Sequence, residues 1–185
     1  MPSSAHIFGA DSKAKIIRLF VFNTSQSFTP KEISTRAKER PATVRSELRA
    51  LSKGKLIRKR GKGYTLNSSY PNLPALESFL VDVSPVSHSE IIKKLNKAGM
   101  IKLVVIAGVF THDPESRVDL LIVGDNLKQR TLVSAISAIE AELGRELRYA
   151  AFETGDFKYR LSLYDKLIRD ILDYPHKKIL DKFGI

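Results

Sequence analysis

Basic side chains are the clearest candidates for chemistry in this chain, and they are concentrated near its beginning. Residues 1–67 contain 15 lysines and arginines and 4 acidic residues, so this third carries the whole formal net charge of +11. Residues 68–185 contain 16 basic and 16 acidic residues. A compact domain with such an excess of positive charge most often binds a polyanion such as DNA or RNA. The uneven distribution therefore predicts two domains with different partners.

Several of these cations are expected to share one face of a helix. Val44, Leu48 and Leu51 recur at the spacing of an amphipathic helix that starts near Pro41. At about 100° per residue, the opposite face presents Ala42, Arg45, Ser46, Arg49 and Lys53. An arginine can bridge two acceptors on guanine, so Arg45 and Arg49 are the candidates for reading base sequence. The alternative is that Arg45 pairs with Glu32 or Glu39.

Two helices are expected before this one, and a hairpin is expected after it. A first helix should run from about Asp11 to Phe22. The sequence Thr29-Pro30-Lys31-Glu32 places an N-cap threonine, a proline and a glutamate in the order that starts a helix, and this second helix should end near Ala37. Two strand-like runs, LIRKR and YTLN, flank Gly61-Lys62-Gly63 and predict a hairpin with a basic tip.

The segment TPKEISTRAKERPATVRSELRALSKGKLIRKRGKGYTLN resembles the winged helix-turn-helix domains of bacterial and archaeal transcriptional regulators. In that family the second helix of the helix-turn-helix enters the major groove, and the hairpin, called the wing, reaches phosphates or a minor groove. The resemblance implies contacts with double-stranded DNA. The implied residues are Thr43, Arg45, Ser46, Arg49 and Lys53 in the helix and Arg58, Arg60 and Lys62 in the wing.

A short polar stretch separates this region from the rest of the chain. The sequence NSSYPNLP is rich in Ser, Asn and Pro and has no apolar period, which is typical of a linker. We therefore expect a basic winged-helix domain at 1–67, a linker at 68–73 and a second domain at 74–185.

The second domain has the pattern of an α/β fold. Apolar runs at 101–107 and 118–123 and the run LRYAAFE at 147–153 predict three strands of a mixed sheet. Between them we expect a helix that opens at Ser87-His88-Ser89-Glu90 and is closed by Gly99, a long helix that Gly144 ends, and a final helix from Thr154 or Asp156 to about Tyr174. Strands that alternate with helices indicate a layered α/β arrangement.

The segment VVIAGVFTHDPESRVDLLIVGD resembles the nucleotidyltransferase fold of the DNA polymerase beta superfamily. That family carries a Gly-Ser turn, an Asp-x-Asp pair on the next strand and a third acid on a later strand. Gly108 matches the glycine and Asp119 matches the second aspartate. Val109 replaces the serine, Arg117 replaces the first aspartate, and Glu153 is the candidate for the third acid.

These replacements predict that the family's chemistry is lost. Two aspartates two positions apart on a strand lie about 6.6 Å apart on the same side and can gather Mg²⁺. Arg117 would place a permanent cation there and could pair with Asp119, so we expect an inactive domain that needs no metal or cofactor. Its role would be ligand sensing, self-association or support. An active enzyme stays open if the acids are Asp113, Glu115 and Asp119, although Asp113-Pro114-Glu115 is typical of a turn.

Together these patterns predict a transcriptional regulator that binds double-stranded DNA as a homodimer, with a small molecule or nucleotide as the expected kind of effector. The competing functions are an active nucleotidyltransferase that its winged helix delivers to a target, and a module that contacts an acidic protein. The chain has no cysteine, which excludes disulfides and thiolate metal sites. It has no apolar stretch long enough to cross a membrane and no signal-peptide pattern, so we expect a cytoplasmic location without a membrane partner.

Overall fold

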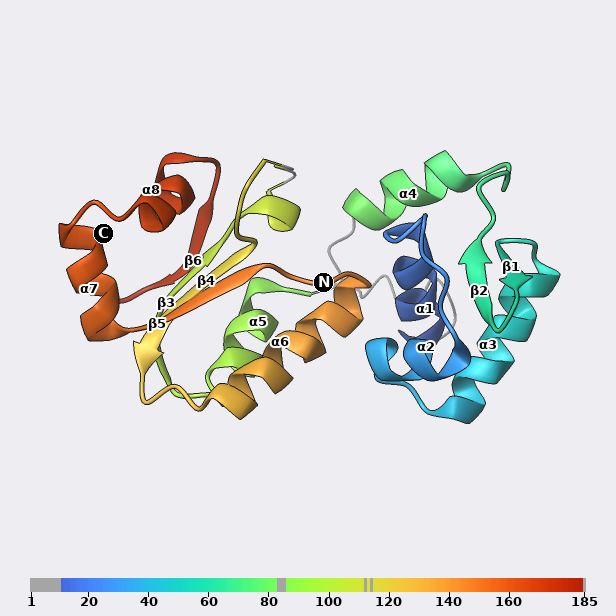
Figure 1. Cartoon of the computed structure of the whole chain (residues 1–185), viewed down its shortest axis with the longest axis horizontal. Helices are drawn as coiled ribbons and strands as arrows, with labels where there is room; N and C mark the ends of the chain where they lie inside the picture. The colour runs from blue at the N-terminus through green and yellow to red at the C-terminus, as the bar shows by residue number, and fades with distance from the viewer. Residues whose placement is uncertain (1–10, 83–85, 112, 114, 185) are drawn as a thin grey trace. The chain divides into compact units, whose positions relative to one another are not determined.

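The computed structural model describes residues 11–82, 86–111, 113 and 115–184 (Figure 1). Its contacts divide the chain into two compact units. The first comprises the chain up to Ser87 together with Ser137–Arg145, and the second comprises His88–Ile136 and the chain from Glu146 onward. The prediction that residues 68–73 link two independently folding domains stays a prediction. The predicted fold class is confirmed, with three helices and a hairpin followed by a four-stranded mixed sheet with helices.

The first unit has the predicted order of three helices and a two-stranded hairpin. Its apolar faces meet in one core that includes Phe20, Ile33, Val44 and Leu48, all almost fully buried. The strands pair in antiparallel register, with Ile57 opposite Leu66 and Arg60 opposite Gly63. The elements are α1 (Asp11–Val21), α2 (Pro30–Ala37), α3 (Pro41–Lys53), β1 (Ile57–Arg60) and β2 (Gly63–Leu66).

The start of α2 confirms the predicted capping box. The Thr29 hydroxyl accepts a hydrogen bond from the Glu32 backbone N–H, and the Glu32 carboxylate accepts one from the Thr29 backbone N–H at 2.7 Å. Two otherwise unpaired N–H groups are thereby satisfied at the helix end. Pro30 occupies the first turn, where its missing N–H costs nothing.

Thr29→Ala is expected to lower the free energy of unfolding by about 1 kcal/mol, because the N-cap acceptor is lost. Urea unfolding followed by circular dichroism measures this change. Thr24→Ala, in the exposed turn after α1, is the matched control and should have a smaller effect. Equal stability of the Thr29 variant and the wild type would contradict a stabilising cap.

Two segments that the sequence did not assign to the first unit complete its core. Helix α4 (Leu73–Asp82) was not predicted, and its Leu80 is buried in the core of α1–α3. The end of α6 (Gln129–Leu143) and Gly144 lie against α1. There the Asn23 side-chain amide donates a hydrogen bond to the Gly144 carbonyl at 2.8 Å. A Cβ at Gly144 would collide with the backbone of Arg18, which requires glycine at this position.

A cluster of charges accompanies the contact between α1 and α6. The Lys15 ammonium lies 3.1 Å from the Glu142 carboxylate and 3.4 Å from the Glu39 carboxylate. Burial lowers the pKa of Lys15, but its hydrogen bonds and the charges of the two glutamates outweigh this effect, so the pKa lies above its ordinary value. The cluster therefore keeps a half-buried lysine ionised while it joins α6 to α1.

The second unit is built on a sheet with strand order β5-β4-β3-β6. Strands β4 and β5 are parallel, and β3 is antiparallel to both β4 and β6, so the sheet is mixed as predicted. The elements are α5 (His88–Leu95), β3 (Met100–Ile106), β4 (Leu120–Asp125), α6, β5 (Tyr149–Glu153), α7 (Thr154–Ser162), α8 (Lys166–Asp173) and β6 (Lys177–Asp181).

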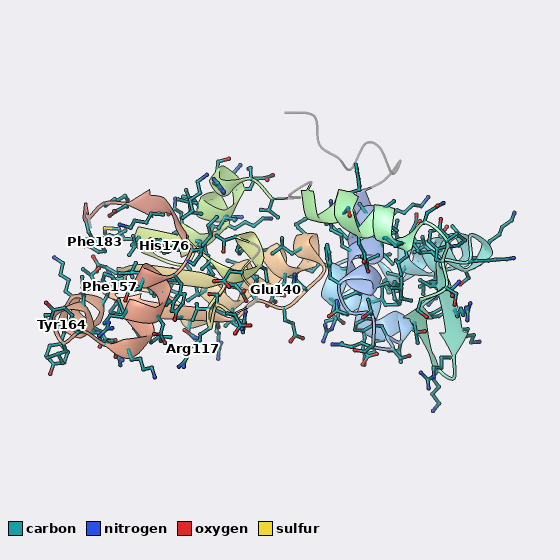
Figure 2. All side chains as sticks on the ribbon, turned by 90° about the horizontal axis from the view of Figure 1, so that it is seen from above. Arg117, Glu140, Phe157, Tyr164, His176 and Phe183 are labelled. Carbon is teal, nitrogen blue, oxygen red and sulfur yellow. The ribbon has the colours of Figure 1, made fainter. Side chains whose placement is uncertain are left out.

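Helices cover both faces of this sheet (Figure 1). Leu103, Val105 and Leu121 pack on Phe157 of α7 and Ile168 of α8 on one face. Because strand residues alternate, the neighbouring positions point to the other face, where α5 and the first part of α6 lie. The Phe157 ring also stacks on the ring of Phe183 with centroids 6.0 Å apart (Figure 2). Such double cover explains why β3 and β4 are almost continuously apolar.

The predictions for the C-terminal part of this unit were wrong in two respects. The final helix is divided into α7 and α8 because Tyr164 has a φ of 53° and Asp165 then caps α8 through its carboxylate. Strand β6 was not predicted, and it pairs with β3 at the edge of the sheet. Across the described part of the chain, no helix has the length and apolar character that a membrane span requires.

Candidate nucleic-acid interface

The exposed face of α3 carries the predicted set of polar and basic residues. The side chains of Arg45, Ser46, Arg49 and Lys53 are exposed, and Thr43 is half-buried. Val44, Leu48 and Leu51 on the opposite face are buried in the core, which fixes the orientation of the helix. The Arg49 Nε donates to the backbone carbonyl of Arg45 at 3.3 Å, so the Arg49 guanidinium lies along its own helix. The α3 face is therefore cationic and accessible.

The acidic side chains near this face are engaged elsewhere. Glu39 lies 3.4 Å from Lys15, and Glu47 lies 3.6 Å from Lys13. Hydrogen bonds from the Thr29 backbone N–H and hydroxyl lower the pKa of Glu32 below its ordinary value and keep this carboxylate at the α2 cap. The alternative pairing of Arg45 with Glu32 or Glu39 is therefore wrong.

The cations of the interface have no carboxylate partner within the described residues. The ion pairs of the structure include none of Arg45, Arg49, Lys53, Arg58, Arg60 and Lys62. Neighbouring like charges without a carboxylate repel each other, by a few tenths of a kcal/mol per helical pair. An anion bound at this surface would relieve that repulsion.

The β1–β2 hairpin supplies the second predicted group of cations. Its two-residue turn is Gly61-Lys62, with a φ of 59° at Gly61. Arg58 and Arg60 are two positions apart on β1 and therefore lie on the same side of the hairpin, whereas Lys59 lies on the other. All of these basic side chains are exposed.

A pocket of about 510 Å³ brings three elements of the first unit together. Lys31 of α2, Arg45 of α3 and Lys62 of the hairpin turn line it, together with Thr29, Pro30, Ser34, Thr35 and Pro41. The structure thus places Arg45 and Lys62 beside one pocket, and their contact with DNA stays a prediction. Arg49, Lys53, Arg58 and Arg60 do not line this pocket.

Lys31 was missed by the sequence reasoning. It was treated only as part of the helix start, yet that position also places it beside the pocket. One sequence feature could have pointed to Lys31. It follows Pro30 in the first turn of α2, where the helix dipole favours a bound anion.

The candidate nucleotidyltransferase residues of the second unit are arranged differently from the prediction. Asp119 is 1% exposed and precedes β4. Its carboxylate accepts hydrogen bonds from the backbone N–H of Val109 at 3.0 Å and of Arg148 at 2.8 Å, and it pairs with the Arg148 guanidinium at 3.2 Å. The sequence reasoning missed Arg148, whose distance from Asp119 along the chain gave no signal of this contact. All these groups hold the Asp119 carboxylate inside the fold.

The Asp119 carboxylate also restricts which residue can occupy position 108. The φ of Gly108 is 52°, and a Cβ at this position would collide with the Asp119 Oδ1. Glycine is needed here because it tolerates the left-handed conformation and leaves room for the carboxylate. Val109 contributes its backbone N–H rather than a side-chain hydroxyl.

Arg117 and Glu153 lie away from Asp119. The expected Arg117–Asp119 pair is wrong, because the exposed Arg117 guanidinium lies 3.4 Å from the Asp170 carboxylate instead. Glu153 pairs in register with Gly124, five positions along from Asp119, which corresponds to about 16 Å at about 3.3 Å per residue. Its carboxylate accepts hydrogen bonds from the backbone N–H groups of Asn126 and Leu127. Asp119 and Glu153 therefore do not form a common acidic site.

The alternative acids also take up local structural roles. The Asp113 carboxylate accepts a hydrogen bond from the Glu115 backbone N–H at 3.0 Å, as in an ordinary turn. Within the described part of the chain, no group of three or more histidine and acidic side chains is arranged to hold a metal ion.

Comparisons of this chain with protein-family models, with curated proteins and with solved structures find no match. The functional assignment therefore depends on the geometry of the two units.

Proposed function

We propose that the first unit binds double-stranded DNA and that the protein is a transcriptional regulator. The observation that carries this proposal is the convergence of cations from α2, α3 and the β1–β2 hairpin around one pocket, none of which forms an ion pair within the described residues. In the winged helix-turn-helix arrangement, α3 is the recognition helix and the hairpin is the wing. Lysine and arginine contacts with phosphates supply affinity, and contacts from α3 to base edges supply sequence preference.

The second unit serves regulation in this proposal rather than catalysis. Asp119 is enclosed by backbone N–H groups and Arg148, which leaves little room for a reacting group. An active nucleotidyltransferase would need carboxylates that converge on a metal ion, whereas Asp119 precedes the first residue of β4 and Glu153, on β5, pairs with Gly124 near the other end of that strand. We propose self-association or the sensing of a small molecule or nucleotide as its role. A homodimer would read paired half-sites.

Duplex binding measured at several salt concentrations tests the proposed function. Each neutralised phosphate contributes about −0.9 to the slope of log K against log salt, so four or more contacts give a slope of about −4 or steeper. Fluorescence anisotropy with a labelled duplex of random sequence measures it. A slope near zero, or no binding at low salt, would reject DNA as the partner and favour an acidic protein.

Sequence preference needs a second experiment. Duplexes enriched from fragmented genomic DNA by the full-length protein should share a motif, and footprinting should place two half-sites about one helical turn apart. Enrichment without a shared motif would leave only sequence-independent binding and would contradict a regulator that reads an operator.

A further inference from the structure

We propose that the pocket between α2, α3 and the hairpin turn is a binding site for a phosphate group, and that a free phosphate ester held there competes with DNA. Lys31, Arg45 and Lys62 are its three cations, each from a different element. The competition rests on the proposed function, because Arg45 and Lys62 would serve both ligands. Binding of the free anion can nevertheless be measured without DNA.

The charges around the pocket favour an anion. No carboxylate is among the residues that line it. Within the described residues, none of its three cations takes part in an ion pair. The nearest acid along α2 is Glu32, and its carboxylate is held by the Thr29 backbone N–H and hydroxyl. A phosphate would therefore meet three cations without displacing a carboxylate.

The hydroxyl groups in the lining define the ligand further. The Thr29 hydroxyl donates to Glu32, the Ser34 hydroxyl donates to the Glu39 carbonyl at 2.6 Å, and the Thr35 hydroxyl donates to the Lys31 carbonyl at 3.1 Å. The side-chain donors that remain are the lysine ammonium groups and the Arg45 guanidinium, which have no acceptor capacity. The site thus suits a ligand rich in acceptor oxygens, as an ionised phosphate is, better than a neutral polyol.

The start of α3 strengthens the positive potential of the pocket. Pro30 and Pro41 both line the pocket, and they occupy the first turns of α2 and α3. Helix α3 has no side-chain cap and no acidic residue in its first turn, so its N-terminal N–H groups lack a carboxylate. Such N–H groups carry partial positive charge and stabilise anions.

The size of the pocket decides which phosphates fit. A volume of about 510 Å³ is within the usual range for small-ligand sites and exceeds the space that one phosphate group fills. The site therefore has room for a phosphate together with the group to which it is esterified. A backbone phosphodiester of DNA and a free phosphate ester share this chemistry, and experiments with each source distinguish them.

The first experiment uses inorganic phosphate as the probe. Amide chemical shifts of the ¹⁵N-labelled full-length protein are followed during a titration, with sodium chloride at matched ionic strength as the reference. We expect saturable shifts at residues around the pocket and, in Lys31→Ala and Lys62→Ala, about 3- to 10-fold weaker binding. Lys59→Ala removes one exposed charge of the hairpin that does not line the pocket, and this variant should bind phosphate as the wild type does.

The same spectra show whether each variant is folded, so loss of binding cannot be confused with unfolding. Identical shifts with phosphate and chloride would overturn the proposal, as would unchanged phosphate affinity in both the Lys31 and the Lys62 variants.

The second experiment adds a duplex. Competition between phosphate and the duplex at constant ionic strength, abolished in Lys31→Ala, supports the pocket as a site that both ligands share. Saturable phosphate binding without duplex binding would reject the proposed function but retain the pocket as a site for free phosphate esters. Duplex binding without saturable phosphate binding would overturn the proposed phosphate site and leave the proposed DNA binding in place.

Discussion

Asp119→Ala is expected to lower the free energy of unfolding by about 2–6 kcal/mol. The Asp119 carboxylate is 1% exposed and accepts from two backbone N–H groups, those of Val109 and Arg148. Its removal leaves both donors without their partner, and each unsatisfied buried donor costs about 1–3 kcal/mol. Urea unfolding followed by circular dichroism measures the difference.

Two further variants separate the contributions to this cluster. Arg148→Ala should cost about 1 kcal/mol or less, because the Arg148 side chain is 54% exposed and its backbone N–H still donates to Asp119. Asp119→Asn should be intermediate, since the amide keeps one acceptor oxygen but loses the charge. Wild-type stability of Asp119→Ala would contradict a structural role and would return Asp119 to the candidates for catalysis.

Simultaneous replacement of Arg45 and Arg49 by alanine is expected to weaken duplex binding by about 100-fold or more at about 0.1 M salt. Each arginine contact with a base or phosphate contributes about 1–3 kcal/mol, and tenfold in affinity corresponds to about 1.4 kcal/mol. The two side chains are exposed and make no ion pair within the described residues, so the variant should keep its stability. Anisotropy titrations and thermal unfolding measure the two quantities.

The matched control removes two cations outside the proposed interface. Lys59→Ala/Arg130→Ala lowers the net charge by the same amount, and both side chains are exposed. Its affinity should fall far less than that of the α3 variant. Equal losses in the two double variants would show that binding depends on net charge alone and would contradict α3 as the recognition helix.

The single arginine variants should differ from each other. Arg45 lines the phosphate pocket, so Arg45→Ala should weaken binding to all duplexes to a similar extent. Arg49 lies outside the pocket on the same helix, and its loss should also relax the base preference at one position.

Local signals explain why the first unit could be predicted closely. The capping box at Thr29, the proline at Pro41 and the glycine turn at Gly61 each act within a few residues, and all three elements appear where they were expected. Helix α4 and strand β6 depend instead on distant partners. Three of the five residues of β6, KKILD, are charged, and its pairing with β3 joins residues far apart in the sequence, such as Val104 and Leu180.

The candidate sites show the same difference between local signals and distant partners. The exposed face of α3 could be derived from helical periodicity, since it needs only the positions of Val44, Leu48 and Leu51. The partners of charged groups could not be derived in this way. Lys31 joins Arg45 only when α2 packs on α3, and Arg148 reaches Asp119 only when β5 is placed beside β4.

The residues from Ser137 to Arg145 have a practical consequence for anyone who divides this protein. A fragment that stops at Ser87 would keep every proposed DNA contact, yet Lys15 would lose Glu142 and the Asn23 amide would lose the Gly144 carbonyl. Such a fragment would leave one flank of α1 open to water and to aggregation. Fusion proteins that include the basic first part of the chain should therefore also include a replacement for residues 137–145.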